Sequence, residues 1–260
     1  MSEGKGRVRL FMGGSFNPIT IAHLRILELA RDFVGRNLGL RVEAAVISPV
    51  GDFYPEKRLQ SASDRVAMCK LAAETTSKLA TEAELDPWIR VDDWESKQDK
   101  WIRTLDNLKR QQAMVDEEYE AKSSDECNVT STDDECCQPT QAKPRMMLVC
   151  GTDLIHSFKK PGLWLIEDLE VILRDFGILC ITRKGFDDNY LDAIPSELSH
   201  LVKPTGPFSG IHVVEEWVSN EISSTKVRFG LKNGLTVQYL VTDSVFTYIQ
   251  ERHLYKTEPE

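Results

Sequence analysis

Residues 8–25 constrain the fold of this chain more than any other stretch. An apolar run at 8–12 ends at Gly13-Gly14, and the apolar residues of 21–29 have helical spacing. The pattern predicts a strand, a tight glycine turn and a helix. Such a turn leaves main-chain N–H groups at a helix start, where the free donors and the helix dipole favour an anion. His23 falls in the first turns of this helix, so the stretch predicts a phosphate site.

The rest of the chain alternates short apolar runs with segments of helical spacing. Strand-like runs lie at 42–47, 88–91, 146–150 and 211–214, and further apolar runs lie at 171–173 and 177–181. The helical segments include one from Trp101 to about Tyr119 and two near the end of the chain, 224–232 and 242–253. This alternation predicts an α/β fold, a Rossmann-like parallel sheet with helices on both faces.

Three polar, turn-rich loops, 13–20, 48–58 and 151–153, each follow a predicted strand. In parallel sheets ligands lie beyond the carboxyl ends of the strands, so we expect these loops to form one composite cleft. The chain contains neither G-x-G-x-x-G nor G-x-x-x-x-G-K-[ST], which excludes the ordinary dinucleotide and P-loop fingerprints.

Acidic residues are concentrated in one segment. Nine Asp and Glu residues lie between Asp116 and Glu135 against one base, Lys122, while the whole chain carries a formal net charge of −9. We predict one domain over 1–260 with a disordered acidic insert at about 120–143, because low hydrophobicity with clustered charge opposes a packed core. The negative charge also argues against nucleic acid as a partner.

Composition also indicates the cellular compartment of the protein. The apolar runs are too short to span a membrane, and the N-terminal residues lack the apolar region of a signal peptide. The six cysteines include no C-x-x-C pair, which favours a reducing compartment over a disulfide scaffold or zinc site. We therefore expect an intracellular protein, cytoplasmic or nuclear, without a basic nuclear signal in the insert and without a membrane partner.

A second anion site is predicted at residues 221–228, Glu-Ile-Ser-Ser-Thr-Lys-Val-Arg. Hydroxyl groups open a helix there, and Lys226 and Arg228 stand in its first turns. Hydroxyls, free N–H groups and cations at one helix start suit a polyphosphate. An ordinary serine cap with two solvated bases is the alternative for this stretch taken alone.

Together these motifs resemble a known family. Gly14-Ser-Phe-Asn-Pro-Ile-Thr-x-x-His23 is similar to the G-x-F-x-P-x-[HT]-x-x-H signature of nucleotidyltransferases, and 222–228 matches their I-S-S-T-x-x-R motif. The chain also contains four shorter motifs: Ser48-Pro-Val-Gly-Asp52, Val91-Asp-x-Trp-Glu-Ser96, Gly151-Thr-Asp153 and Gly162-Leu-Trp164. The set in this order resembles the eukaryotic nicotinamide/nicotinate mononucleotide adenylyltransferases.

The resemblance implies a nucleotidyltransferase-type fold and adenylyl transfer from ATP to nicotinamide mononucleotide (NMN) or nicotinate mononucleotide. The products would be NAD or its deamido form and pyrophosphate. The acceptor arrives as a phosphate anion, so the protein need only position the reactants and neutralise charge, without a protein nucleophile. Magnesium would be carried by the ATP phosphates, with no metal site made by the protein.

The resemblance also assigns residues to the ATP side. His23, Lys57 and Arg228 would carry catalysis. The ATP-binding residues would be Gly14, Ser15, Phe16, His23, Ser223, Ser224, Thr225 and Arg228.

On the acceptor side, Trp101 and Trp164 match the two rings that sandwich nicotinamide in the family, and Thr104 matches the partner of its amide or acid group. Tryptophan offers the best face to a pyridinium cation. The full set implied for NMN and NAD is Ser15, Phe16, Lys57, Trp101, Thr104, Gly151, Asp153, Leu163, Trp164, Arg183 and Glu215. Without the resemblance, Trp101 and Trp164 could equally be core residues, and Trp88, Trp94 and Trp217 are expected to serve packing.

The chain departs from the family pattern at several places. Pro55-Glu-Lys57 stands where relatives carry three lysines, so we assign the NMN phosphate contact to Lys57. Asp64 replaces a frequent histidine, and Glu215 replaces a frequent asparagine near the adenosine. In the insert, Cys136 and Cys137 are weak candidates for lipidation.

Two alternatives stay open. One is another adenylyl- or cytidylyltransferase of the same fold, although an aliphatic acceptor would not require Trp101 and Trp164. The other is a chaperone-like role beside or instead of catalysis. The sequence leaves the formation of homo-oligomers open.

Overall fold

A parallel sheet of six strands, ordered β3-β2-β1-β4-β5-β6, forms the centre of the molecule. The computed structural model describes residues 6–54, 59–77, 88–127, 142–182 and 192–256, and of 122–127 the backbone alone. The strands are β1 (Arg7–Gly14), β2 (Arg41–Pro49), β3 (Ile89–Val91), β4 (Arg145–Gly151), β5 (Ile178–Thr182) and β6 (Ile211–Glu215). All five strand pairings are parallel, which confirms the predicted α/β fold with a Rossmann-like sheet.

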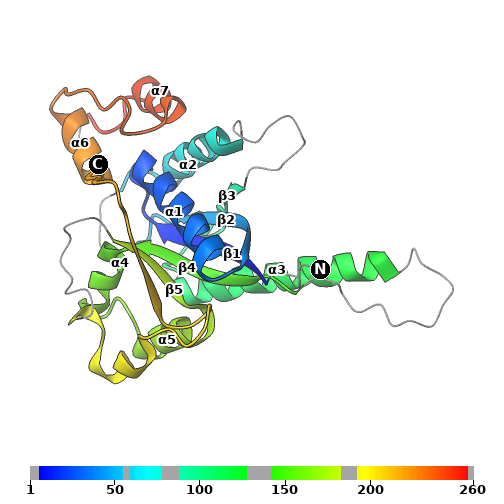
Figure 1. The fold of residues 1–260 in the computed structure, drawn as a ribbon. Coiled ribbons are helices and arrows are strands. Elements are labelled where there is room, and N and C mark those ends of the chain that lie inside the picture. Colours follow the sequence, from blue (N-terminus) through cyan, green and yellow to red (C-terminus); the bar gives the residue numbers. More distant parts are fainter. Residues whose placement is uncertain (1–5, 55–58, 78–87, 128–141, 183–191, 257–260) are drawn as a thin grey trace.

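Helices cover both faces of this sheet (Figure 1). The α-helices are α1 (Ile21–Asn37), α2 (Ala62–Ser77), α3 (Thr104–Cys127), α4 (Thr152–His156), α5 (Ile166–Val171), α6 (Ser224–Lys232) and α7 (Asp243–Glu251). Short 3-10 turns lie at Glu95–Lys97, Ser157–Lys159 and Ser196–Leu201, and a π-helical turn at Ile172–Phe176 continues α5. Helices α1, α2, α6 and α7 share one apolar core with the sheet, and α3, α4 and α5 share the other.

Alternation along the strands explains the two cores. In β1, Val8, Leu10 and Met12 enter the core with α1, whereas Phe11 enters the core with α3. Successive strand residues point to opposite faces, so a central strand between two helix layers must be apolar at every position. The run at 8–12 meets this requirement except at Arg9, whose guanidinium pairs with Glu43 and Glu118.

The observed bounds differ from the predicted ones at α3. The helix expected from Trp101 begins at Thr104 and continues to Cys127, eight residues past Tyr119, and Figure 1 shows its far part projecting beyond the sheet. The predicted insert at 120–143 is therefore helical over 120–127, while 128–141 lie outside the described residues. The run at 171–173 joins α5 to the π-helical turn and forms no strand.

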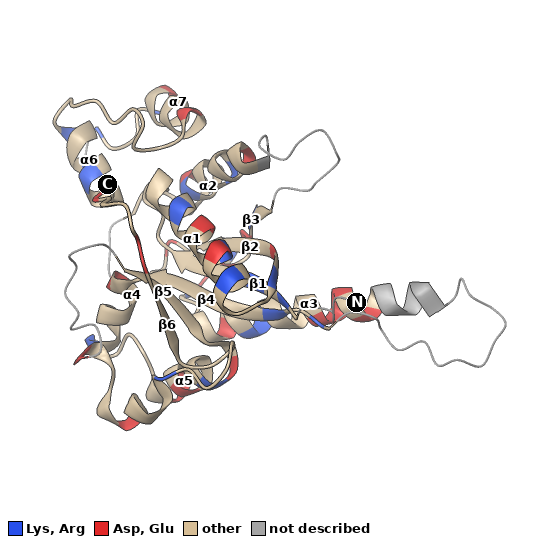
Figure 2. Ribbon diagram, viewed as in Figure 1, with Lys and Arg blue, Asp and Glu red and all other residues tan. Residues whose placement is uncertain are grey.

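Apart from Asp106 in its first turn, the described acidic residues of α3 gather on the part of the helix beyond the sheet (Figure 2). Two of them meet cations from the sheet side: Glu118 contacts Arg9 at 2.7 Å and Asp116 contacts Lys143 at 3.1 Å. These pairs partly neutralise the segment where it leaves the sheet. Among the described helices, none has the length and apolar character needed to cross a membrane.

Candidate active site

A cleft of about 720 Å³ lies beyond the carboxyl ends of the central strands, as the loop positions predicted. This volume is in the range of small-molecule sites. Fourteen of the residues expected at the site line it: Gly14, Ser15, Phe16, His23, Trp101, Thr104, Gly151, Asp153, Leu163, Trp164, Ser223, Ser224, Thr225 and Arg228. We call the region of 13–20 and 222–228 the phosphate end, and the region of Trp101, Thr104, Leu163 and Trp164 the tryptophan end.

The carbonyl groups of the loop after β1 are held from behind. The Gly14 carbonyl accepts the N–H of Val50 (3.0 Å), and the Ser15 carbonyl accepts Nη1 of Arg65 (2.9 Å). A peptide is planar, so a carbonyl held away from the cleft turns the next N–H the opposite way. The N–H of Phe16, a cleft-lining residue, is therefore available to an anion. Phe16 itself has a φ of 44°, an uncommon backbone conformation for an aromatic residue, which these contacts maintain.

Two further loop carbonyls are held from α6. The Asn17 carbonyl accepts Nη1 of Arg228 (2.7 Å), and the Pro18 carbonyl accepts the hydroxyl of Ser224 (2.7 Å). The two predicted anion sites, some 200 residues apart in sequence, are thus parts of one structure. Arg228 lines the cleft and also fixes the loop, a second role that the motif alone did not reveal.

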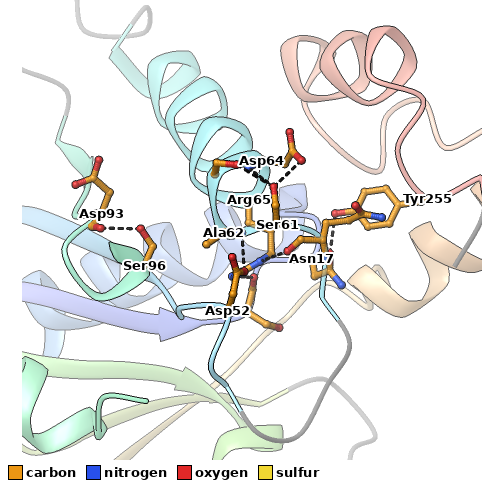
Figure 3. A network of polar contacts seen from close by, with 12 residues as sticks. Asn17, Asp52, Ser61, Ala62, Asp64, Arg65, Asp93, Ser96 and Tyr255 are labelled. Carbon is orange, nitrogen blue, oxygen red and sulfur yellow. Dashed lines mark hydrogen bonds and ion pairs between the residues drawn. The ribbon is translucent and has the colours of Figure 1, made fainter. Parts of the chain in front are cut away.

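Arg65 is the central cation of the network behind the loop (Figure 3). Its side chain is fully buried, and it donates to the carbonyls of Ser15 and Gln60 and to the Asp52 carboxylate (3.2 Å). A buried guanidinium is tolerated where its donors are satisfied in this way. Arg65 therefore joins α2, the loop after β2 and the phosphate end.

The C-terminal segment reaches the same network. Tyr255 donates its hydroxyl to Oδ1 of Asn17 (2.8 Å), and the Gln60 N–H donates to the same atom (3.3 Å). Figure 3 shows the Tyr255 ring over Asn17. Asp64, where relatives often carry histidine, accepts Oη of Tyr248 and pairs with Arg252, so here it anchors α7 to α2.

His23 has a defined tautomer. Its Nδ1 accepts the Thr20 main-chain N–H (3.0 Å) in the capping box that opens α1. A main-chain N–H can only donate, so Nδ1 must carry a lone pair and the ring proton of the neutral imidazole sits on Nε2. His23, which lines the cleft, can therefore donate through Nε2–H to an anionic group at the phosphate end.

The start of α6 provides a second group of donors. Ser223 caps the helix through its hydroxyl, which accepts the N–H of Lys226, and Thr225 accepts Nη2 of Arg228. Lys226 pairs with Glu221 and does not line the cleft. Of the two bases that the motif offers, Arg228 alone reaches the site.

The tryptophan end combines aromatic faces with a helix start. Trp164 donates Nε1 to Ser157 (2.9 Å) and meets the ring of Phe158 edge-on at 4.9 Å, which fixes its orientation. Trp101 precedes α3, and Thr104 is the first residue of that helix, so main-chain N–H groups of its first turn lie near the cleft.

The structure does not bring every expected residue to the cleft. Glu215 is exposed on β6 and does not line it, whereas the following residue, Glu216, turns inward and binds Arg25 in two contacts of 3.1 and 3.3 Å. Trp217, expected to serve packing, is 73% exposed. Lys57, Arg183, Cys136 and Cys137 lie outside the described residues.

The cleft also contains charged residues that sequence reasoning missed. They are Arg25, Glu95, Arg103, Lys160, Asp168 and Glu216. Arg103 pairs with Asp168 (3.0 Å), whose pKa is raised by burial even though Arg103 opposes the shift. Arg103 adjoins Thr104, and Arg25 lies two residues after His23. Their nearness to predicted site residues is the sequence feature that could have indicated these two arginines.

Comparison with known proteins identifies the class of fold. The family model for cytidylyltransferase-like proteins matches residues 11–229. A Plasmodium falciparum nicotinic acid mononucleotide adenylyltransferase complexed with NaAD superposes with a TM-score of 0.60 at 18% identity, covering 96% of this chain and 98% of its own. At that identity the likeness shows the fold alone.

Relatives in sequence identify the family within this class of fold. Nicotinamide/nicotinic acid mononucleotide adenylyltransferase 1 of Bos taurus is 37% identical over 98% of this chain and 91% of its own length. The nicotinamide/nicotinic acid mononucleotide adenylyltransferase of Arabidopsis thaliana is 35% identical over 98% of this chain and 92% of its own length. The chain therefore belongs to the nicotinamide/nicotinic acid mononucleotide adenylyltransferases, within the cytidylyltransferase-like family.

Proposed function

We propose that this protein transfers the adenylyl group of ATP to nicotinamide mononucleotide or nicotinate mononucleotide. The observation that carries the proposal is the single cleft. It joins the two anion-binding motifs at one end and Trp101, Thr104 and Trp164 at the other. The names of the relatives at 35–37% identity support the same activity.

The reaction is a displacement at phosphorus. A phosphate oxygen of the mononucleotide attacks the α-phosphorus of ATP, the bond to the bridging oxygen breaks, and pyrophosphate leaves. The nucleophile is already an anion, so no protein base is needed. The protein supplies positioning and charge stabilisation through the loop N–H groups, Nε2–H of His23 and the hydroxyls and guanidinium of α6.

Magnesium is proposed to enter with ATP. The donors at the phosphate end are N–H groups, hydroxyls and a guanidinium, which bind phosphate oxygens and leave the metal to those oxygens. No group of three or more His, Cys, Asp or Glu residues that could hold a metal occurs in the described parts of the chain. When bound, the ion would neutralise charge on the phosphates.

One assay tests the function. The purified protein is given ATP, magnesium and either pyridine mononucleotide, and dinucleotide and pyrophosphate are measured. We expect product with at least one acceptor, and loss of product on chelation that magnesium restores. Failure with both acceptors, or turnover with CTP or a phosphoalcohol instead, would contradict the proposal.

An intracellular location is proposed with the function. Cys69, Cys150 and Cys180 are buried free thiols, as expected in a reducing compartment. Cell fractionation with compartment markers tests this.

A further inference from the structure

A buried carboxyl group lies in the wall of the cleft and has no part in the mechanism above. Glu95 is 6% exposed, yet it lines the cleft. Its Oε2 accepts the Ser48 hydroxyl (3.0 Å) and Nδ2 of Asn107 (2.8 Å). Of the three, Ser48 is fully buried and Asn107 is 1% exposed, so the cluster is a built feature of the interior.

The cluster lies under the tryptophan end. Asn107 is three residues after Thr104 on α3, so the two share one face of the helix. Ser48 comes from the carboxyl end of β2, and the main chain of Glu95 backs Gly51, whose missing Cβ would lie 3.2 Å from the Glu95 carbonyl oxygen. The carboxyl group is therefore held between β2 and the helix that carries Thr104.

Glu95 can hold a proton near neutral pH. Burial raises its pKa to about 7, against the hydrogen bonds from Ser48 and Asn107, which lower it. The other charged groups around it are Asp92, which raises the pKa and is bound to Arg110 and Gln111 of α3, and Arg65 of α2, which lowers it. Both charge states of Glu95 are therefore populated around neutrality.

The neighbouring amide accommodates either state. Oδ1 of Asn107 is buried without a hydrogen-bond partner, the one such side-chain atom in the described residues. With Glu95 ionised, Asn107 donates to it through Nδ2. If Glu95 gains a proton, rotation of the Asn107 amide by half a turn exchanges its oxygen and nitrogen and presents the oxygen to that proton. The rotation also ends the donation from Nδ2 to the Ser48 hydroxyl oxygen (2.8 Å), and one amide atom stays unpaired in both arrangements.

We propose that Glu95 determines, through its charge state, how the cleft discriminates between the carboxamide and the carboxylate forms of the pyridine mononucleotide acceptor. This inference rests on the proposed function. An ionised Glu95 under Thr104 repels the acceptor's carboxylate and leaves the neutral carboxamide unaffected. Arg103, held by Asp168 and Asp106, favours the carboxylate at every pH in this range and cannot produce the same dependence.

The test is a ratio. The kcat/KM for nicotinate mononucleotide is divided by that for NMN, at intervals from pH 5.5 to 9. The acceptor phosphates titrate alike in both substrates and cancel. We expect the ratio to fall by about three- to tenfold, centred near pH 7, as for like charges that repel each other across a partly wet cleft. An active enzyme with a ratio that does not change with pH overturns the inference but leaves the proposed function intact; absence of turnover with both acceptors overturns both.

Three variants identify the group responsible. Glu95→Gln should abolish the step in the ratio. Ser48→Ala removes a donor that stabilises the ionised form, so its step should move to higher pH. Asp168→Asn is the matched control, since it removes another buried carboxylate of the cleft and should keep the midpoint near pH 7. A step that survives in Glu95→Gln, or one that disappears in Asp168→Asn, would overturn the assignment.

Discussion

The two ends of the cleft are built by different means. At the phosphate end the backbone of the loop after β1 lies against the cleft, and its direction is set by carbonyls tied to Val50, Arg65, Arg228 and Ser224. At the tryptophan end side chains line the cleft, over a buried acid that titrates near neutrality. The difference indicates that binding of the phosphates should depend on rigid geometry, whereas selection of the acceptor should depend on aromatic surface and local charge.

The largest expected effect is at the phosphate end. His23→Ala removes the Nε2–H donor and the capping contact to Thr20, and we expect kcat to fall by about 100- to 1000-fold, as for loss of one oriented donor. Steady-state kinetics measure the loss, and thermal unfolding checks that the fold is retained. Full activity in this variant would remove His23 from the mechanism.

A change at the tryptophan end should separate the two ligands. Trp164→Ala removes a ring fixed by Ser157 and Phe158, and we expect the acceptor KM to rise about 10- to 100-fold with the ATP KM nearly unchanged. Trp164→Phe, which keeps an aromatic face, should recover most of the loss. Equal effects on both KM values would contradict the division of the cleft into two ends.

The buried acid should also be visible in stability. The folded pKa of Glu95, about 7, lies above its ordinary value of 4.5, so between these values the folded protein binds more protons than the unfolded chain. The contribution of Glu95 to the free energy of unfolding therefore falls as pH rises through this window. Above pH 7 we expect the ionised carboxylate to lower that free energy by about 2 kcal/mol. Denaturant unfolding of wild type and Glu95→Gln at pH 5 and pH 8 measures it. The variant should be more stable relative to wild type at pH 8 than at pH 5, and the opposite sign would contradict the prediction.

The smallest effect returns to the phosphate end. Tyr255→Phe removes the hydroxyl bound to Oδ1 of Asn17, and we expect the ATP KM to rise about three- to tenfold, the size of one lost hydrogen bond. Tyr248→Phe is the matched control, because it removes a hydroxyl that ties the preceding helix, α7, to Asp64 and not to the loop. Equal ATP KM values in the two variants would show that Tyr255 stabilises the fold without positioning the loop.

Much of the phosphate end could be predicted from sequence because its rules are local. A strand, glycines and a helix start determine where N–H groups lie, and residues 13–23 and 222–228 contain that pattern almost unbroken. The α/β fold could be predicted for the same reason, because apolar runs that alternate with helical segments indicate a sheet between two layers of helices. Spacing did not show that Glu216, and not Glu215, lines the cleft, because the end of a strand can turn the next residue inward.

The sequence alone determined the parallel sheet and the two helix-start motifs that the cleft brings together, and it placed the tryptophans on the acceptor side only through the family resemblance. The tertiary structure decided that Arg228, Arg65 and Tyr255 hold the loop from behind, and that Glu95 titrates near pH 7. The physical reason is that hydrogen-bond partners far apart in sequence, and the burial that shifts a pKa, exist only once the chain has folded. Local patterns specify which groups can bind; packing specifies which way they point and what charge they carry.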